Sequence, residues 1–194
     1  MADEEAIPTL CFGDVESTGL DPRVHRPWEI AAIIREPGLP DEEHVFQLRP
    51  DLSKADPEAL QINRFEERFA VPDGVDATWR INGDGPWRLQ LHEAVTEIQL
   101  LLADTHLVAA VPSFDDGMLK ALMWDHQRLV RWKYRLVCVE TLVCGALRRP
   151  VPEGLKAAAD LMGVKYDPDE LHTALGDARL ARDVYDAVMA GGAR

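Results

Sequence analysis

The chain has 194 residues, of which 46% are hydrophobic, and this is enough to bury the core of one domain. Its formal net charge of −13 argues against binding nucleic acid through many Lys and Arg contacts, but not against a nuclease whose metal ions supply positive charge. No apolar run approaches the roughly 20 residues of a membrane span, and the acidic start is unlike a signal peptide. We expect one domain, residues 1–194, in a soluble cytoplasmic protein with no membrane partner.

The first 50 residues carry three apolar segments with the pattern of β-strands. These segments are residues 9–16, 28–34 and 44–49. Short connections join them, which favours an antiparallel meander over long crossovers. The first segment is apolar on both faces until two acids appear near its end, so it is expected to be a central strand.

The next 40 residues are expected to form one helix and one long loop. Asp56 followed by Pro57 is typical of a helix N-cap and first turn, so a helix should run from Pro57 to about Phe69. Residues 71–88 contain Pro, Gly and two tryptophans without periodicity, and we interpret them as a single loop.

From residue 89 onward, helical and strand patterns alternate. Apolar spacing predicts helices at 89–103, from residue 113 or 115, at 155–162 and at 173–189. Strands are predicted at 105–111 and 135–140. The predicted fold is an α/β domain with a central mixed sheet of five strands, three antiparallel N-terminal strands followed by parallel ones, flanked by helices.

Two acids close the first strand. Side chains two residues apart in a strand face the same side, so Asp14 and Glu16 lie in one row. Like charges this close raise each other's pKa unless a cation lies between them, so the pair needs a shared proton or a metal ion. The stretch 14–20 is also rich in turn-forming residues, and a solvated acidic turn explains it equally well.

Helix periodicity directs two further acids inward. Asp115 and Asp177 each share a helix face with several apolar residues. A buried carboxylate is costly unless it is paired or binds a metal. Taken singly, Asp115 could be an N-cap, Asp177 a first-turn acid that complements the helix dipole, and His172 a capping or core histidine. Four inward acids with a histidine just before the last are explained better together, by a metal site.

These residues resemble the DEDDh group of DnaQ-like 3′-to-5′ exonucleases, which have the ribonuclease H-like fold. The stretch 14–20 resembles the first motif of that family, and Phe114-Asp115 resembles the second. Residues 172–178 match the third motif, His-x-Ala-x-x-Asp-Ala, closely. The resemblance covers nearly the whole chain.

One position indicates the subclass, and another departs from the family. His172 stands five residues before Asp177, as in the histidine type, and Thr173 occupies the position of the tyrosine in the other type. Val111 replaces the Asn that the family commonly has four residues before the acid of its second motif. This change leaves Asp115 as a ligand but puts in doubt how the terminal nucleotide is held.

The resemblance implies a metal-dependent enzyme that releases nucleoside 5′-monophosphates from the 3′ ends of single-stranded DNA or RNA. Four acids would hold two Mg²⁺ or Mn²⁺ ions. These acids are Asp14, Glu16, Asp115 and Asp177. His172 would take the proton from the attacking water. The residues expected to contact the terminal nucleotide, with turn chemistry as the alternative for the first four, are Ser17, Thr18, Gly19, Leu20 and Phe114.

Two alternatives stay open. A catalytically weak or inactive module of the same fold could bind nucleic acid or accompany a DNA polymerase or another replication or repair protein, although all five motif residues are present. Basic and aromatic residues at 128–135 could stack on bases and contact phosphates. They could equally form a solvated turn with Trp132 packed beneath it.

Overall fold

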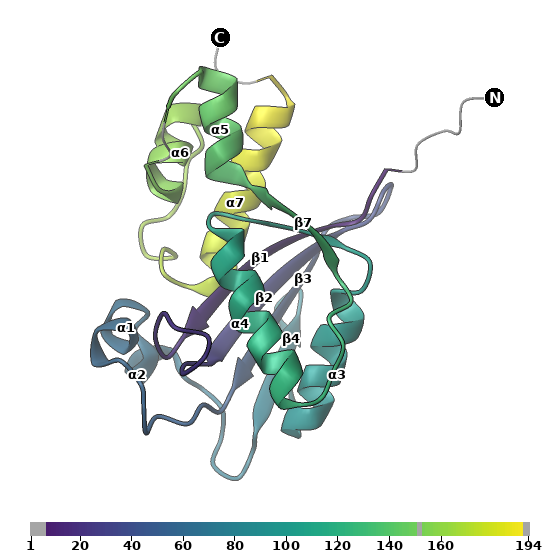
Figure 1. Cartoon of the computed structure of the whole chain (residues 1–194), viewed down its shortest axis with the longest axis vertical. Helices are drawn as coiled ribbons and strands as arrows, with labels where there is room; N and C mark the ends of the chain where they lie inside the picture. Colours follow the sequence, from purple (N-terminus) through teal and green to yellow (C-terminus); the bar gives the residue numbers. More distant parts are fainter. Residues whose placement is uncertain (1–6, 151–152, 192–194) are drawn as a thin grey trace, which may run out of the picture.

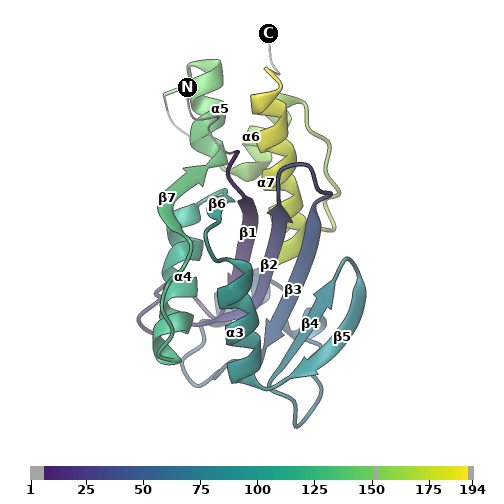
Figure 2. The same cartoon turned by 90° about the vertical axis from the view of Figure 1, so that its right-hand side faces the viewer.

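The computed structural model describes residues 7–150 and 153–191. In this part of the chain, seven strands form one mixed sheet in the order β5-β4-β3-β2-β1-β6-β7 (Figures 1 and 2). The strands are β1 (Leu10–Ser17), β2 (Pro27–Arg35), β3 (Glu42–Leu48), β4 (Ala77–Ile81), β5 (Asp84–Leu89), β6 (His106–Ala109) and β7 (Lys133–Cys138). Strands β1 to β5 pair antiparallel in chain order, whereas β6 is parallel to β1 and β7 is parallel to β6.

Helices cover both faces of the sheet (Figure 2). They are α1 (Pro57–Ile62), α2 (Phe65–Arg68), α3 (Leu91–Leu101), α4 (Pro112–Asp125), α5 (Val139–Leu147), α6 (Leu155–Met162) and α7 (Ala174–Met189). On one face, α3 and α4 pack over the core that includes Cys11 and Val15 of β1. On the other, α5, α6 and α7 pack over the core that includes Phe12.

The alternation of β1 decides which face carries the acids. Cys11 and Val15 are buried against α3 and α4, while Phe12, two residues before Asp14, is buried on the α7 side. Because side chains alternate along a strand, Asp14 and Glu16 also face α7. Strand β2, next to β1, is buried from Pro27 to Ile34, as expected for the centre of a sheet covered on both sides.

The α/β architecture with a mixed sheet flanked by helices is confirmed, but the prediction of five strands is wrong. Residues 71–88 are not one loop, because β4 and β5 extend the antiparallel part of the sheet from three strands to five. Asn82 and Gly83, with φ of 50° and 86°, form the turn between them. An Asn-Gly pair is a strong hairpin signal that the search for periodicity missed. The alternation is weak because β5 is an exposed edge strand.

Two helices also differ from expectation. The helix predicted from Pro57 to about Phe69 is interrupted at Arg64, whose left-handed φ of 53° separates α1 from α2. Residues 139–147 form α5, which was not predicted, and the strand before it ends at Cys138. The thiol of Cys138 caps α5 by accepting a hydrogen bond from the Thr141 backbone N–H.

Within the described ranges, we find no helix with the length and apolarity of a membrane span.

Candidate active site

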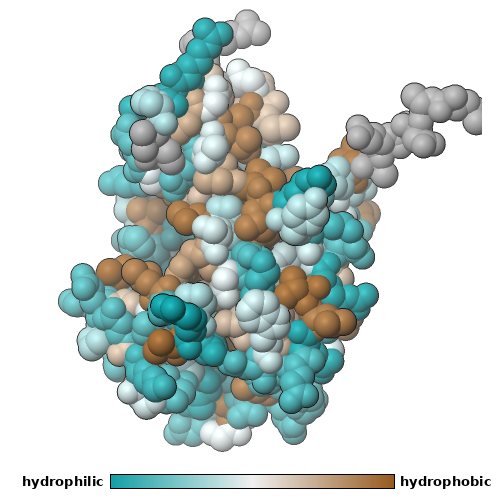
Figure 3. Space-filling view, in the orientation of Figure 1, coloured by the Kyte–Doolittle hydropathy of each residue, from teal (hydrophilic) through white to brown (hydrophobic). Residues whose placement is uncertain are grey.

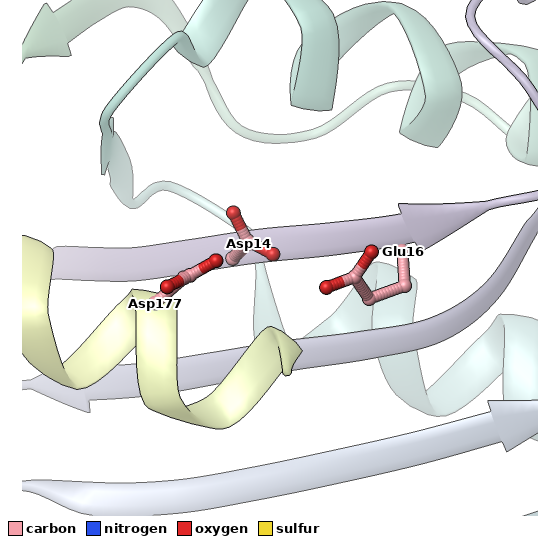
Figure 4. A group of neighbouring side chains, drawn as sticks. All are labelled: Asp14, Glu16 and Asp177. Carbon is pink, nitrogen blue, oxygen red and sulfur yellow. The ribbon is translucent and has the colours of Figure 1, made fainter. Parts of the chain in front are cut away.

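Three carboxylates converge where β1 meets the first turn of α7. Asp14 and Glu16 project from β1, and Asp177 projects from α7 toward them (Figure 4). One oxygen of each carboxylate lies within 4.8 Å of an oxygen of the other two. All three residues are partly buried, so water reaches them only in part. The row predicted on the strand and the acid predicted on the last helix therefore come together in space.

The three carboxylates of this cluster have raised pKa values, because burial outweighs the effect of the nearby positive charge. Burial, followed by the charges of Asp115, Glu16 and Asp177, raises the pKa of Asp14 well above its ordinary value. Burial raises the pKa of Glu16 to about 8, against the opposing charge of Arg68. Burial likewise raises the pKa of Asp177. Carboxylate oxygens are the ligands that Mg²⁺ and Mn²⁺ prefer, so the donor set suits a hard divalent cation.

Asp115 lies beside this cluster but is not one of the three converging residues. Its side chain is only 3% exposed, and burial raises its pKa to about 7. The backbone polar groups of Asp115 and Val15 lower this pKa, against the effect of burial. Val111 is the N-cap residue of α4, so the interpretation of Asp115 as the N-cap is wrong. The charge of Asp115 is the largest of those that raise the pKa of Asp14.

Asp116, the next residue, provides an internal contrast. Its carboxylate accepts a hydrogen bond from Lys120 at 2.6 Å and another from the indole N–H of Trp132 at 2.9 Å. This acid is therefore paired, whereas its neighbour Asp115 has no cationic partner among the causes of its pKa shift. Trp132 is buried, which agrees with the alternative in which residues 128–135 form a turn with Trp132 packed beneath it.

His172 stands at the edge of the carboxylate cluster. Its backbone N–H donates to Asp177 at 3.2 Å, and its side chain is exposed. The charge of His172 lowers the pKa of Asp177, against the effect of burial. The capping role belongs to Thr173, whose hydroxyl accepts from the Gly176 N–H at 3.0 Å. The interpretations of His172 as a cap or a core residue are therefore wrong.

The loop that follows β1 is held by its own hydrogen bonds. The hydroxyl of Ser17 donates to the Gly19 carbonyl at 2.6 Å, and that of Thr18 accepts from the Arg26 N–H at 3.2 Å. A Cβ at Gly19 would lie 2.5 Å from the ring of His25, so a larger residue would require that ring to move. These contacts fit the turn alternative, and contact of these three residues with the terminal nucleotide stays a prediction.

Leu20 and Phe114 line a groove of about 310 Å³ that opens beside Glu16. Leu20 is 76% exposed, and Ile62 forms a further part of the apolar wall. Asn63 lies under the groove and donates to the Ser17 carbonyl at 2.9 Å. Neither Ile62 nor Asn63 was predicted, because both belong to α1 and its C-cap, a segment with no recognised motif.

Comparisons with solved protein structures identify proteins with a similar fold. No protein-family model matches the sequence, and no curated protein does either. Product-bound exonuclease I has a TM-score of 0.67 at 19% identity over 94% of this chain and 43% of that one. E. coli exonuclease I in complex with a dT13 oligonucleotide has a TM-score of 0.65 at 18% identity, and the match covers 94% of this chain and 41% of that one. Exonuclease I from Methylocaldum szegediense has a TM-score of 0.64 at 20% identity, and the match covers 94% of this chain and 40% of that one.

The chain spans about two fifths of the length of these exonuclease I structures. At this level of identity the likeness concerns the fold. The mixed sheet, with antiparallel strands on one side of β1 and parallel strands on the other, is flanked by helices on both faces. The chain therefore has the ribonuclease H-like fold of exonuclease I.

Proposed function

We propose that this chain is a metal-dependent 3′-to-5′ exonuclease that hydrolyses single-stranded DNA or RNA from the 3′ end. The observation that carries the proposal is the convergence of Asp14, Glu16 and Asp177 beside an exposed histidine. In the part of the chain that the structure describes, these carboxylates form no ion pair with an arginine, unlike Asp41 and Glu43, and a divalent cation would supply the missing charge.

Asp14, Glu16 and Asp177 would hold Mg²⁺ or Mn²⁺, with Asp115 beside Asp14 as the fourth acid. When bound, two such ions supply the charge that stabilises the attacking and leaving oxygens of an in-line displacement at phosphorus. His172 accepts the proton of the attacking water as the new P–O bond forms. The bond to the 3′-oxygen of the preceding nucleotide breaks, that oxygen takes a proton from solvent, and a nucleoside 5′-monophosphate leaves.

The groove beside Glu16 suits the terminal nucleotide. Its apolar wall of Leu20, Ile62 and Phe114 offers surfaces on which a base can stack or pack. On the face seen in Figure 3, hydrophobic residues form separate patches among hydrophilic ones. The net charge of −13 favours short single strands over long duplexes, because few cations are available for phosphate contacts. The dT13 oligonucleotide bound to *E. coli* exonuclease I supports single-stranded DNA as a substrate.

The test is digestion of matched DNA and RNA single strands labelled at the 3′ or the 5′ end, with Mg²⁺, Mn²⁺ or EDTA. We expect divalent-dependent release of mononucleotides from the 3′ end, and a 5′-labelled ladder that shortens progressively. Running DNA and RNA side by side determines the preferred sugar. Absence of divalent-dependent digestion across both panels would refute the enzyme and favour the binding module.

A further inference from the structure

We infer that α2 and its N-cap residue form a positioning element for the general base: Arg64 and Arg68 hold the loop before α7 by its carbonyl groups and thereby fix His172 beside the acids. Arg64 is the N-cap residue of α2, with a left-handed φ of 53°, and Arg68 is the last residue of that helix. This inference rests on the proposed function, because it assigns a role to residues around the same site.

The clamp consists of hydrogen bonds to three carbonyl groups. Arg64 Nη2 donates to the carbonyl oxygens of Asp169 and Leu171, at 2.9 and 3.3 Å. Arg68 Nη1 donates to the carbonyl oxygen of His172 at 2.7 Å. Figure 1 shows α1 and α2 at the same end of the sheet as the first turn of α7. Residues about 100 positions apart in sequence are thus joined directly at the loop that carries the histidine.

Arg68 is itself held by a buried acid. Its Nη2 pairs with the carboxylate of Glu29, which is 5% exposed, and its guanidinium lies 5.1 Å from the ring centre of Trp28. The same Glu29 oxygen accepts the backbone N–H of Ala174 at 3.1 Å. Glu29 therefore reaches both sides of Thr173, through Arg68 to the residue before it and directly to the residue after it.

The loop needs such support because its conformation is tight. His172 has a left-handed φ of 58°, which a non-glycine residue rarely adopts. A Cβ at Gly176 would lie 2.1 Å from the Glu170 carbonyl oxygen, so the chain folds back closely on itself. The exposed side chain of His172 is not fixed by packing. Its direction therefore depends on the backbone that the arginines hold.

Arg64 gives the cleaner test. The charge of Arg68 also acts on Asp14, Glu16 and Asp177, so replacing Arg68 changes the site electrostatically as well. Among the described residues, the side chain of Arg64 donates hydrogen bonds only to backbone carbonyl groups of this loop. Arg49 is a matched control, because it donates to the carbonyls of Val71 and Pro72, away from the acids.

The first experiment is a double-mutant cycle on a short 3′-labelled oligonucleotide. We expect Arg64→Gln to lower kcat by roughly 10- to 100-fold, the scale of a misplaced catalytic group, with KM nearly unchanged. In a His172→Ala background the same change should cause no further loss, because there is no base left to position. Arg64→Lys should recover part of the rate, and Arg49→Gln should keep it. An unchanged kcat, or a full additional loss without His172, would overturn the inference.

The second experiment does not depend on activity. Hydrogen exchange of the metal-free protein should show faster exchange in Arg64→Gln at the N–H groups of His172 and Ala174, which donate to Asp177 and Glu29. Arg49→Gln should leave these amides protected. Unchanged protection would overturn the clamp whether or not the protein digests nucleic acid. Lost protection in a protein without nuclease activity would support the clamp and refute the proposed function alone.

Discussion

Two acidic clusters lie along α7, and they differ in their partners. At one, the carboxylates of Asp41 and Glu43 from the start of β3 pair with arginines at 2.6 to 2.8 Å. These arginines are Arg35 and Arg179, with Arg182 further away at 3.6 to 3.8 Å. Their hydrogen bonds hold the pKa of both carboxyls below the ordinary values. At the other cluster, burial raises the pKa of Asp14, Glu16 and Asp177.

The difference distinguishes structural acids from a cation site. Arginines satisfy the first cluster permanently, so it joins β2, β3 and α7 without further ligands. Among the described residues, the only arginine or lysine whose charge lowers the pKa of an acid in the second cluster is Arg68, and that side chain already pairs with Glu29. Under the proposed function, a divalent cation would complete this arrangement.

The largest expected effect on activity is the difference between two variants, each of which replaces one acid of one cluster with alanine. Asp14→Ala should reduce mononucleotide release by roughly 10³-fold or more, because a group that organises charge at the reacting phosphate is lost. Asp41→Ala, the matched change in the paired cluster, should leave kcat unchanged. The measurement is initial rate with saturating Mn²⁺. Equal losses in both variants would mean that general destabilisation, and not a cation site, explains the result.

His172 should give the next largest effect. His172→Ala should lower kcat by about 10²- to 10⁴-fold, the usual contribution of a general base, while metal binding remains. Calorimetry and rate measurements on the same preparation check the two halves separately. If the rate survives, another group accepts the proton, and the acids alone would account for the site.

The pH dependence of stability separates the two clusters further. Glu16 and Asp115 have folded pKa values of about 8 and about 7, above the ordinary values of 4.5 and 3.8. The folded metal-free protein therefore binds more protons than the unfolded chain between about pH 4 and pH 8, so this stability is lost as pH rises through that window. Thermal unfolding should show Tm falling from pH 5 to pH 8. Glu16→Gln should flatten the slope; an unchanged slope would assign it to general charge repulsion.

The smallest expected effect has opposite signs at the two clusters. In metal-free protein at pH 8, Asp14→Asn should raise Tm by roughly 2–4 °C, since about 1 kcal/mol of repulsion is removed. Asp41→Asn should lower the unfolding free energy by up to about 1 kcal/mol, because it breaks a partly exposed ion pair. Denaturation curves in EDTA measure both. A loss of stability in Asp14→Asn would show that its charge is already compensated.

Strand and helix periodicity could predict the acids, because the direction of a side chain within one element depends on local geometry. Phe12 and Asp14 share a face of β1, and Asp177 shares a face of α7 with Ala181 and Val184, which are buried. The hairpin at residues 77–89 could also have been predicted from Asn82 and Gly83, had turn chemistry been weighed above periodicity.

The supporting residues could not be predicted in this way. Arg68 ends a four-residue helix without a motif, Arg64 is the N-cap residue of that helix, and their partners lie about 100 positions away. The pairing of Glu29 depends on how Arg68 of α2 and Ala174 of α7 meet this residue of β2. Such roles arise from tertiary contacts, which a single sequence does not specify locally.

Titration of Mn²⁺ into the metal-free protein tests the cation site most directly. Calorimetry near pH 7.5 should show saturable binding that Asp14→Asn weakens by at least roughly 10-fold and that Asp41→Asn leaves unchanged. Binding should release protons, because burial raises the pKa of Glu16 to about 8 and keeps this group partly protonated before the ion enters. Saturable binding lost equally in both variants, or no binding at all, would contradict the account.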